Sequence, residues 1–173
     1  MNRVVIIGPG GAGKSTLARQ LGERLGIEVV HLDRVFWRPG WVRVPREEQQ
    51  QLLQEICDRD HWIIDGNHGG TMQIRLERAD TVIFLDLHPL RCCWRVLRRC
   101  VRDFGRTRFD LAPDCPEKLP PPVFLWWILT FRHRRSPEIR QRLTELAPSP
   151  AIHILQTPSD VARWTSSPQA NLT

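Results

Sequence analysis

The nine residues "GPGGAGKST", Gly8 to Thr16, decide the fold of this chain. They follow the apolar run "RVVII" (3–7) and precede the helix-like stretch "LARQLGERLG" (17–26). Their spacing matches G-x-x-x-x-G-K-[ST], and the pattern stands between a strand and a helix, which is the context it requires. The sequence therefore predicts a loop that wraps phosphate groups.

Each part of this loop has an expected role. Backbone N–H groups would turn toward phosphate oxygens, Lys14 would reach the β- and γ-phosphates, and the Ser15 hydroxyl would coordinate Mg²⁺. The following helix adds the positive end of its dipole. The predicted nucleotide-binding residues are Gly8, Pro9, Gly10, Gly11, Ala12, Gly13, Lys14, Ser15 and Thr16. ATP and Mg²⁺ are the expected ligands.

Apolar runs alternate with helical patterns along the rest of the chain. The expected strands are residues 3–7, 27–32, 62–64, 81–85 and 151–155. The expected helices are residues 15–25, 46–59, 71–78, 89–103, 123–132 and 137–146. Strands that alternate with helices indicate βαβ units and a parallel sheet covered on both faces. We therefore expect an α/β fold with a five-stranded parallel sheet, in one domain over residues 1–164.

Composition places the chain among ordinary globular proteins. Its 173 residues are 41% hydrophobic and 25% charged, with a formal net charge of +6. No apolar run reaches the roughly 20 residues that span a bilayer. Five cysteines without a C-x-x-C pair favour reduced, mostly buried thiols over disulfides or a zinc site. These features predict a cytoplasmic protein with no membrane association.

Two stretches interrupt the alternation. Residues 34–44, "RVFWRPGWVRV", form an aromatic and basic loop whose rings either cover a ligand or roof the core. Residues 105–122, "GRTRFDLAPDCPEKLPPP", are rich in proline and charge, and a loop this long in a compact domain is typical of a lid. We place the lid at about residues 104–122 and expect residues 165–173 to be a disordered tail.

Three acids follow expected strands. Asp65 in "WIIDGN" is a candidate for the Mg²⁺ hydration shell, because neighbouring strand ends open on the same crevice. Asp33 in "VVHLD" either orients an attacking hydroxyl or is a solvated loop acid. Asp86 in "FLDLHPL" precedes a proline, which favours a helix-capping role, although it competes with Asp65 for the metal.

The expected helix at 89–103 carries two stripes. One is apolar (Leu90, Trp94, Leu97, Val101 and, beyond it, Phe104) and the other is basic (Arg91, Arg95, Arg98 and Arg102, with Arg99 beside it). Arginines crowded on one side of a helix repel one another unless an anion lies there. With a second basic cluster in "FRHRRSP", they are interpreted either as a lid base that closes over a phosphoryl group or as a solvated face.

A resemblance becomes visible in the segments "HLDRVFWRPGW", "WIIDGNHGGTMQIRLERADTVIFLD", "CCWRVLRR", "DCPE" and "FLWWILTF". Together with the phosphate loop they resemble the adenylate-kinase-like proteins known as DNA topology modulation (FlaR-type) proteins. The likeness covers about residues 1–164. It implies the three-layer P-loop NTPase fold of nucleoside monophosphate kinases and shikimate kinase, with sheet order 2-3-1-4-5 and a lid.

The same resemblance implies roles for particular residues. Asp65 falls at the position of the Mg²⁺-associated acid, Arg95 and Arg99 at the lid base, and Arg135 at the arginine that returns after the lid. Arg75 would face the acceptor, with Asp33 and Asp65. The segment 156–161, "QTPSDV", resembles the loop that packs on adenine. No arginine follows the "DG" turn before Arg75, a departure from adenylate kinases that argues against AMP as acceptor.

Together these features predict an ATP-dependent kinase that acts on a small acceptor, a nucleoside or nucleotide by resemblance. Lys14, Asp33, Arg95, Arg99 and Arg135 are its expected catalytic residues. The alternatives are a nucleotide-dependent DNA-topology-modulating or regulatory ATPase and a nucleotide sensor. Basic charge permits nucleic-acid binding, but no DNA-binding motif favours it. A monomer is expected.

Overall fold

A computed structural model describes residues 1–146 and 148–167 of the chain. Its elements in chain order are β1 (Arg3–Ile7), α1 (Lys14–Leu25), β2 (Val29–His31), α2 (Leu32–Val35), β3 (Trp37–Arg38), η1 (Pro39–Trp41), β4 (Val42–Arg43), α3 (Arg46–Cys57), β5 (Trp62–Asp65), η2 (Gly69–Thr71), α4 (Met72–Arg78), β6 (Thr81–Leu85), α5 (Pro89–Arg102), α6 (Pro122–Arg134), α7 (Ser136–Leu146), β7 (Ala151–Leu155) and α8 (Pro158–Ser166).

The main sheet is parallel and has the order β2-β5-β1-β6-β7. Its central strand β1 pairs with β5 on one side and β6 on the other. Counted among these five strands, the order is 2-3-1-4-5, so the predicted fold class and sheet order are confirmed. The order reverses at β1, and the crevice at such a switch point is where α/β proteins bind ligands.

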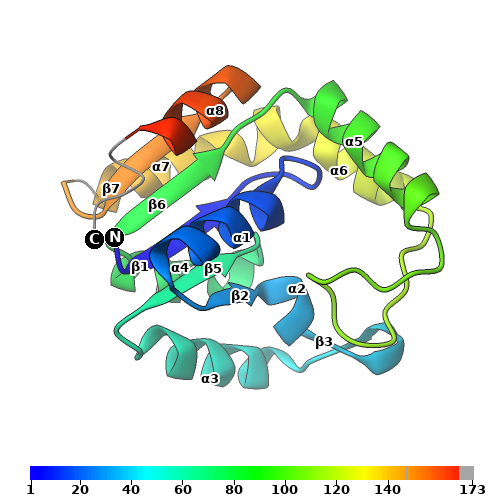
Figure 1. Cartoon of the computed structure of the whole chain (residues 1–173), viewed down its shortest axis with the longest axis horizontal. Helices are drawn as coiled ribbons and strands as arrows, with labels where there is room; N and C mark the ends of the chain where they lie inside the picture. Colours follow the sequence, from blue (N-terminus) through cyan, green and yellow to red (C-terminus); the bar gives the residue numbers. More distant parts are fainter. Residues whose placement is uncertain (147, 168–173) are drawn as a thin grey trace.

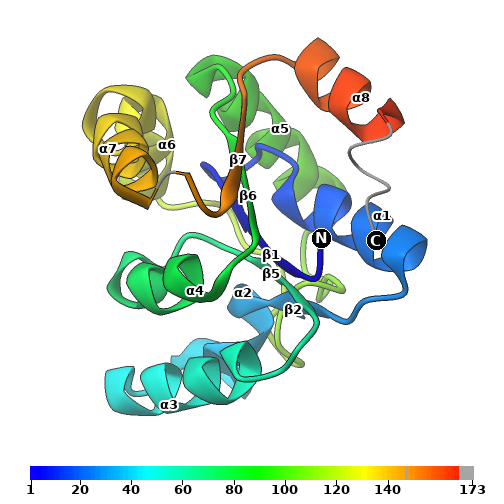
Figure 2. The ribbon, with the colours of Figure 1, turned by 90° about the vertical axis from the view of Figure 1, so that its left-hand side faces the viewer.

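Helices cover both faces of the sheet (Figures 1 and 2). Successive side chains of a strand point to opposite faces, and β1 is buried on both. Val5 and Ile7 pack in one core with α3, α4 and α7, whereas Val4 and Ile6 pack in a second core with α1, α5 and Trp164 of α8. This double burial is why the strands are continuous apolar runs.

The aromatic loop at 34–44 is more ordered than predicted. It contains the short helix α2 and an antiparallel hairpin of β3 and β4, in which Trp37 pairs with Arg43 and Arg38 with Val42. Phe36 is fully buried in the core, so it roofs the core rather than a ligand.

Helix α8 has no counterpart among the predicted helices. Thr157 caps it with a capping box, in which the Thr157 side chain accepts from Asp160 N–H and the Asp160 carboxylate accepts from Thr157 N–H. The signal was present as a threonine followed three residues later by an acid. Of the predicted tail, Thr165 and Ser166 belong to α8, and 168–173 lie outside the described residues.

The cysteines are reduced in this structure, as the sequence predicts. All five cysteines are free, and Cys57, Cys92, Cys100 and Cys115 are buried. Within the described part of the chain, no helix has the length and apolarity needed to cross a bilayer.

Candidate functional site

The phosphate loop is wedged between β6 and α5. Gly8 has a φ of 148°, and a Cβ there would lie 2.5 Å from the Leu85 carbonyl oxygen. Gly11 has a φ of 78°, and a Cβ there would lie 2.3 Å from the Cys92 carbonyl oxygen. Both positions therefore require glycine for conformation and for space. The loop backbone therefore packs closely against β6 and α5 at the switch point of the sheet.

Lys14 begins α1 and reaches back across this loop. Its Nζ donates a hydrogen bond to the Pro9 carbonyl, at 3.0 Å. Burial lowers the pKa of the Lys14 ammonium, and the negative charges of Asp65 and Asp33 oppose that shift. A phosphate group placed beside Nζ would add negative charge and favour the ammonium form further.

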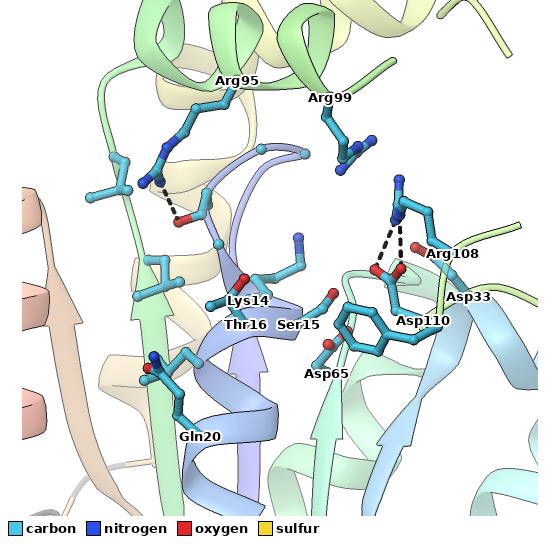
Figure 3. Close-up of a pocket in the computed structure, with 18 of the residues that line it drawn as sticks. Lys14, Ser15, Thr16, Gln20, Asp33, Asp65, Arg95, Arg99, Arg108 and Asp110 are labelled. Atoms are coloured by element: carbon cyan, nitrogen blue, oxygen red, sulfur yellow. Dashed lines mark hydrogen bonds and ion pairs between the residues drawn. The ribbon is translucent and has the colours of Figure 1, made fainter. Parts of the chain in front are cut away.

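A cavity of about 830 Å³ opens in front of the loop (Figure 3). The phosphate loop from Gly10 to Thr16 forms its floor. Among its other lining residues are Gln20, Asp33, Asp65, Arg95, Arg99, Arg102, Arg106, Arg108, Phe109, Asp110, Phe124, Pro158, Val161, Ala162 and Thr165. Apolar groups from α8 lie at one end of the cavity, and the carboxylates of Asp33, Asp65 and Asp110 lie at the other end.

The α8 end of the cavity contains part of the segment that resembles an adenine-binding loop. Pro158 and Val161 of that segment line the cavity, together with Ala162 and Thr165 from later turns of α8. Gln20 of α1 closes the same end. These apolar groups beside polar side chains provide a surface of the kind on which a purine ring packs.

Two acids at the other end are each bonded to a histidine. Asp65, at the end of β5, is buried, and its Oδ2 lies 2.7 Å from Nδ1 of His31. Asp33, in α2, has its Oδ1 2.9 Å from Nε2 of His68. Burial alone would raise the pKa of Asp33, but the hydrogen bond and charge of His68 hold the pKa below the ordinary carboxyl value. Asp33 is therefore ionised at neutral pH.

Arginines from α5 lie above the phosphate loop. Arg95 donates to the Ala12 carbonyl at 3.4 Å (Figure 3). Arg99 lies 3.3 Å from the Glu117 carboxylate. Arg102 lines the same cavity. Part of the basic stripe of α5 therefore faces the place where phosphates would bind.

The structure places Arg135 and Arg75 elsewhere. Arg135 follows α6, is exposed, and pairs with Glu138 at 2.9 Å. Arg75 is fully buried beneath the sheet, and burial lowers its pKa to about 10. One guanidinium nitrogen donates to the Asn67 carbonyl, whereas Nε and Nη1 have no partner among the described residues.

Asn67 connects Arg75 to the phosphate loop. The Asn67 side-chain amide accepts from Gly8 N–H at 3.0 Å and donates to the Gly8 carbonyl at 2.6 Å. Arg75 thus braces the residue that clamps the first glycine of the loop. Its contact with the site is indirect.

The prediction that Asp86 caps a helix is wrong. The N-cap of α5 is His88. The buried Asp86 carboxylate instead accepts from the Ser136 hydroxyl at 2.9 Å and from Arg140 at 2.6 Å. It therefore ties the end of β6 to α7, because a buried carboxylate needs charged or polar partners wherever the fold supplies them.

The lid supplies site residues that sequence reasoning missed. Arg108 pairs with Asp110 at 2.7 Å and with Glu117 at 2.5 Å. Burial alone would raise the pKa of Asp110, but Arg108 and a hydrogen bond from the Ser15 hydroxyl hold it low. The Phe109 ring packs edge-on against His31 at 5.4 Å between centroids. The only signal for these residues was the mixture of charge and aromatic character inside a proline-rich loop.

The lid rests on the hairpin of β3 and β4. Leu111, Ala112 and Cys115 of the lid form a small core with Trp37 and Trp41. The Trp41 indole donates to the Pro116 carbonyl at 3.2 Å, and Gly40 N–H donates to the Asp114 carbonyl at 3.1 Å. The two tryptophans therefore hold the lid over the cavity. In Figure 1 the lid is the segment that runs down from the end of α5 toward β3.

A second cavity, of about 570 Å³, lies on the other side of the Asp33–His68 pair. His68 lines it, together with Arg43, Arg46, Gln49 and Thr71. Because His68 lines this cavity and also bonds Asp33, the pair lies where the two cavities approach each other. Two residues that line the second cavity, Arg43 and Arg46, are arginines, the residue type that binds carboxylates and phosphates in a planar fork.

The oxygen groups of the main cavity fit a bound Mg²⁺. Ser15 and Asp65 present a hydroxyl and carboxylate oxygens, which this hard cation prefers. Across residues 1–146 and 148–167, no three His, Cys, Asp or Glu side chains form a cluster that would hold a metal.

Comparisons with known proteins identify a family and several relatives. The AAA_33 family model, described as an AAA domain, matches residues 4–119. An alignment over 84 residues is 32% identical to shikimate kinase of Xanthomonas euvesicatoria, and an alignment over 111 residues is 28% identical to a probable gluconokinase of Schizosaccharomyces pombe. These alignments cover 42% and 63% of this chain. They span 46% and 50% of the two relatives, about half of each.

The fold has a close counterpart among solved structures. Shikimate kinase from Acinetobacter baumannii in complex with shikimate superimposes with a TM-score of 0.62, over 100% of this chain and 96% of that one, at 18% sequence identity. This likeness concerns the fold alone. The family match, which covers the phosphate loop, β5, α5 and most of the lid, carries the assignment further. The chain belongs to the AAA_33 family, as a P-loop kinase-like domain with shikimate kinase and gluconokinase among its homologues.

Proposed function

We propose that this protein is an ATP-dependent kinase that transfers the γ-phosphoryl group to a hydroxyl of a small anionic acceptor. One observation carries the proposal. A single cavity joins the phosphate loop and Lys14 to Asp33, under arginines from α5 and the lid. Phosphoryl transfer depends mainly on positioning and on positive charge around the equatorial oxygens, and this cavity offers both.

The proposed reaction is one displacement at phosphorus. The acceptor oxygen forms a bond to the γ-phosphorus while the bond to the β–γ bridging oxygen breaks, which leaves ADP. Asp33 aligns the acceptor hydroxyl and accepts its proton late in the step, when bond formation to phosphorus has made that proton acidic. The lowered pKa of Asp33 keeps the carboxylate ionised before transfer, which suits alignment. Lys14, Arg95 and Arg99 stabilise the charge on the phosphate oxygens. Bound Mg²⁺, held by Ser15 and Asp65, would neutralise the β- and γ-phosphates.

The second cavity supports an anionic acceptor. Arg43 and Arg46 lie beyond Asp33, where they would hold a carboxylate or phosphate while a hydroxyl faces Asp33. The relatives named for shikimate and gluconate favour hydroxy acids. Nucleotides, the class implied by the resemblance to adenylate-kinase-like proteins, also carry a hydroxyl and an anion. Hydroxy acids are therefore the first class to test and nucleotides the second.

The DNA-topology alternative draws less support. Arg95, Arg99 and Arg108 line the cavity beside the phosphate loop instead of a surface that a duplex would contact (Figure 3). Phosphate contacts by exposed arginines govern non-specific DNA affinity and make it strongly salt-dependent. Tight, sequence-specific DNA binding at physiological salt would favour this alternative.

The chain offers a matched pair of variants to test the proposal. Lys14 and Lys118 are its only lysines, and Lys118 lies exposed in the lid. We expect Lys14→Met to lower the rate of ADP formation by at least about 100-fold, because it removes the one ammonium at the phosphates. Lys118→Met should retain the wild-type rate. A Lys14→Met protein with full activity would remove the loop from the mechanism.

The acceptor is found by screening hydroxy acids, then nucleosides and nucleotides, for ADP release with ATP and Mg²⁺. The expected result is ADP formation that depends on one acceptor and yields a phosphorylated product by mass spectrometry. Arg46→Met should raise the KM for that acceptor about 10-fold or more and leave the KM for ATP unchanged, since Arg46 lines only the second cavity. ADP release that no acceptor stimulates would support a regulatory ATPase instead.

A further inference from the structure

The apolar stripe of α5 points away from the protein. Leu90, Trp94, Leu97 and Val101 are between 44% and 75% exposed. The buried side of the helix is formed by Cys92, Val96 and Cys100, which pack in the core against the phosphate loop. Large apolar side chains at i, i+4, i+7 and i+11 on a helix ordinarily face a partner. Here the described chain leaves them in water.

Helix α6 extends this surface. It runs antiparallel to α5 and packs beside it (Figure 1). The Cys93 thiol lies 3.8 Å from the Leu125 carbonyl at their contact. Val123, Trp126 and Leu129 of α6 are 72%, 60% and 36% exposed. Residues Leu90, Trp94, Leu97, Val101, Val123, Trp126 and Leu129 are called the α5–α6 face below.

The apolar area that this face exposes is close to the area that one partner buries in a standard protein–protein interface. An aromatic side chain presents roughly 150–250 Å² and an aliphatic one less, so the seven residues expose on the order of 700 Å². The largest apolar patch on a typical monomer is about 300–600 Å². A standard interface buries about 800 Å² on each partner. The face is therefore large enough to form most of one side of a stable complex.

We propose that the α5–α6 face is the dimer interface of this protein, with a second copy of the chain as its occupant. The 4-3-4 spacing of the α5 stripe is that of a helix packed along another helix. Two antiparallel helices with one exposed apolar face form half of a four-helix bundle, and a two-fold axis would complete it. Such an interface is self-complementary because both copies present the same patch.

Arginines lie at the edge of this face. Neither α5 nor α6 contains an acidic residue. Arg91, Arg98 and Arg102 each follow a residue of the stripe, so they flank it on the side that leads to the phosphate cavity, and Arg98 lies over the Trp94 ring at 5.3 Å. In a dimer these like charges would remain at the wet rim and repel weakly. Added salt should therefore strengthen the dimer.

Sedimentation equilibrium of the full chain between about 1 and 100 μM tests the proposal. The expected result is a dimer whose dissociation constant falls as NaCl rises from 50 to 500 mM. Trp94→Glu and Trp126→Glu should each weaken the dimer at least about 100-fold, as expected for a buried aromatic anchor. Val42→Glu is the control, because Val42 is 56% exposed on the β3–β4 hairpin, outside the α5–α6 face.

Three results would overturn the proposal. The first is a monomer throughout this concentration range. The second is a dimer that Trp94→Glu and Trp126→Glu leave intact while their thermal transitions match the wild type. The third is binding of the face to vesicles of phosphatidylcholine and phosphatidylglycerol that weakens with salt and is lost in Trp94→Glu, which would assign the face to a lipid surface. Kinase activity enters none of these measurements, so failure of the proposed function leaves the test intact.

Discussion

Lys14 illustrates how one residue acquires its role from its surroundings. It is one of two lysines among 25 cationic side chains, and the guanidinium groups that dominate this chain are planar forks. The phosphate loop instead requires a compact ammonium on a long stem, which reaches past the loop backbone to Pro9. The same burial that fixes Nζ disfavours the charged ammonium and lowers its pKa. The negative charges of Asp65 and Asp33 favour the ammonium and offset part of that shift. Phosphate binding and proton binding at Lys14 are therefore linked.

This linkage gives a pH prediction. Because the pKa of Lys14 is lowered in the free protein, its ammonium loses a proton at a lower pH than an ordinary lysine does. ATP binds the ammonium form, so ATP affinity should fall as the pH rises toward that lowered pKa, and ATP should raise the pKa. In Lys118→Met protein with ¹⁵N-labelled lysine, the single Nζ signal reports Lys14. A midpoint near the ordinary value of about 10.4 would contradict the prediction.

At the scale of elements, the lid depends on one acid. The Glu117 carboxylate accepts from Arg99 of α5, Arg108 of the lid and the Cys100 thiol. It thereby joins the end of the lid to the helix that carries the phosphate-facing arginines. On its other side the lid packs on Trp37 and Trp41. The lid is a bridge between α5 and the hairpin, so its position affects both ends of the cavity.

Glu117→Gln should loosen this bridge. Loss of the negative charge leaves Arg99 and Arg108 facing each other without their shared anion, and like charges at close range repel. We expect faster hydrogen–deuterium exchange over residues 105–118 and a fall in kcat of about 10-fold, because the arginines lose their alignment. Glu138→Gln, which removes a surface pair with Arg135, is the control. Unchanged exchange in the lid would show that Glu117 does not hold it.

At the scale of the whole molecule, Asp86 connects the end of β6 in the sheet to helix α7, which precedes β7 in the chain. Its carboxylate bonds Ser136 and Arg140 of α7, and Arg140 also lies over the Phe84 ring at 5.9 Å. These contacts hold α7 on the sheet, and Asp86 does not line the main cavity, although its neighbours Leu85 and Leu87 do. Stability and catalysis should therefore separate at this position.

Asp86→Ala should lower the free energy of unfolding by about 2 kcal/mol, since it leaves a buried hydroxyl and a partly buried guanidinium without their acceptor. The Kd for ATP should stay within about twofold of the wild-type value, because Asp86 is not among the residues that line the main cavity. Urea unfolding and ATP titration measure the two quantities, with the exposed Asp60→Ala as control. A large loss of ATP affinity with unchanged stability would place Asp86 in the site.

The sequence by itself determined the phosphate loop, the alternation of strands and helices, and so the parallel sheet. Glycine spacing and double-sided burial are local constraints that leave their mark on consecutive residues. The family resemblance added the sheet order. The tertiary structure decided which distant side chains meet: Arg75 braces Asn67, Asp86 bonds α7, Asp110 reaches Ser15, and the apolar stripe of α5 faces outward. The sequence shows which side chains are charged or apolar. Which residues each of them contacts depends on how the helices pack on the sheet.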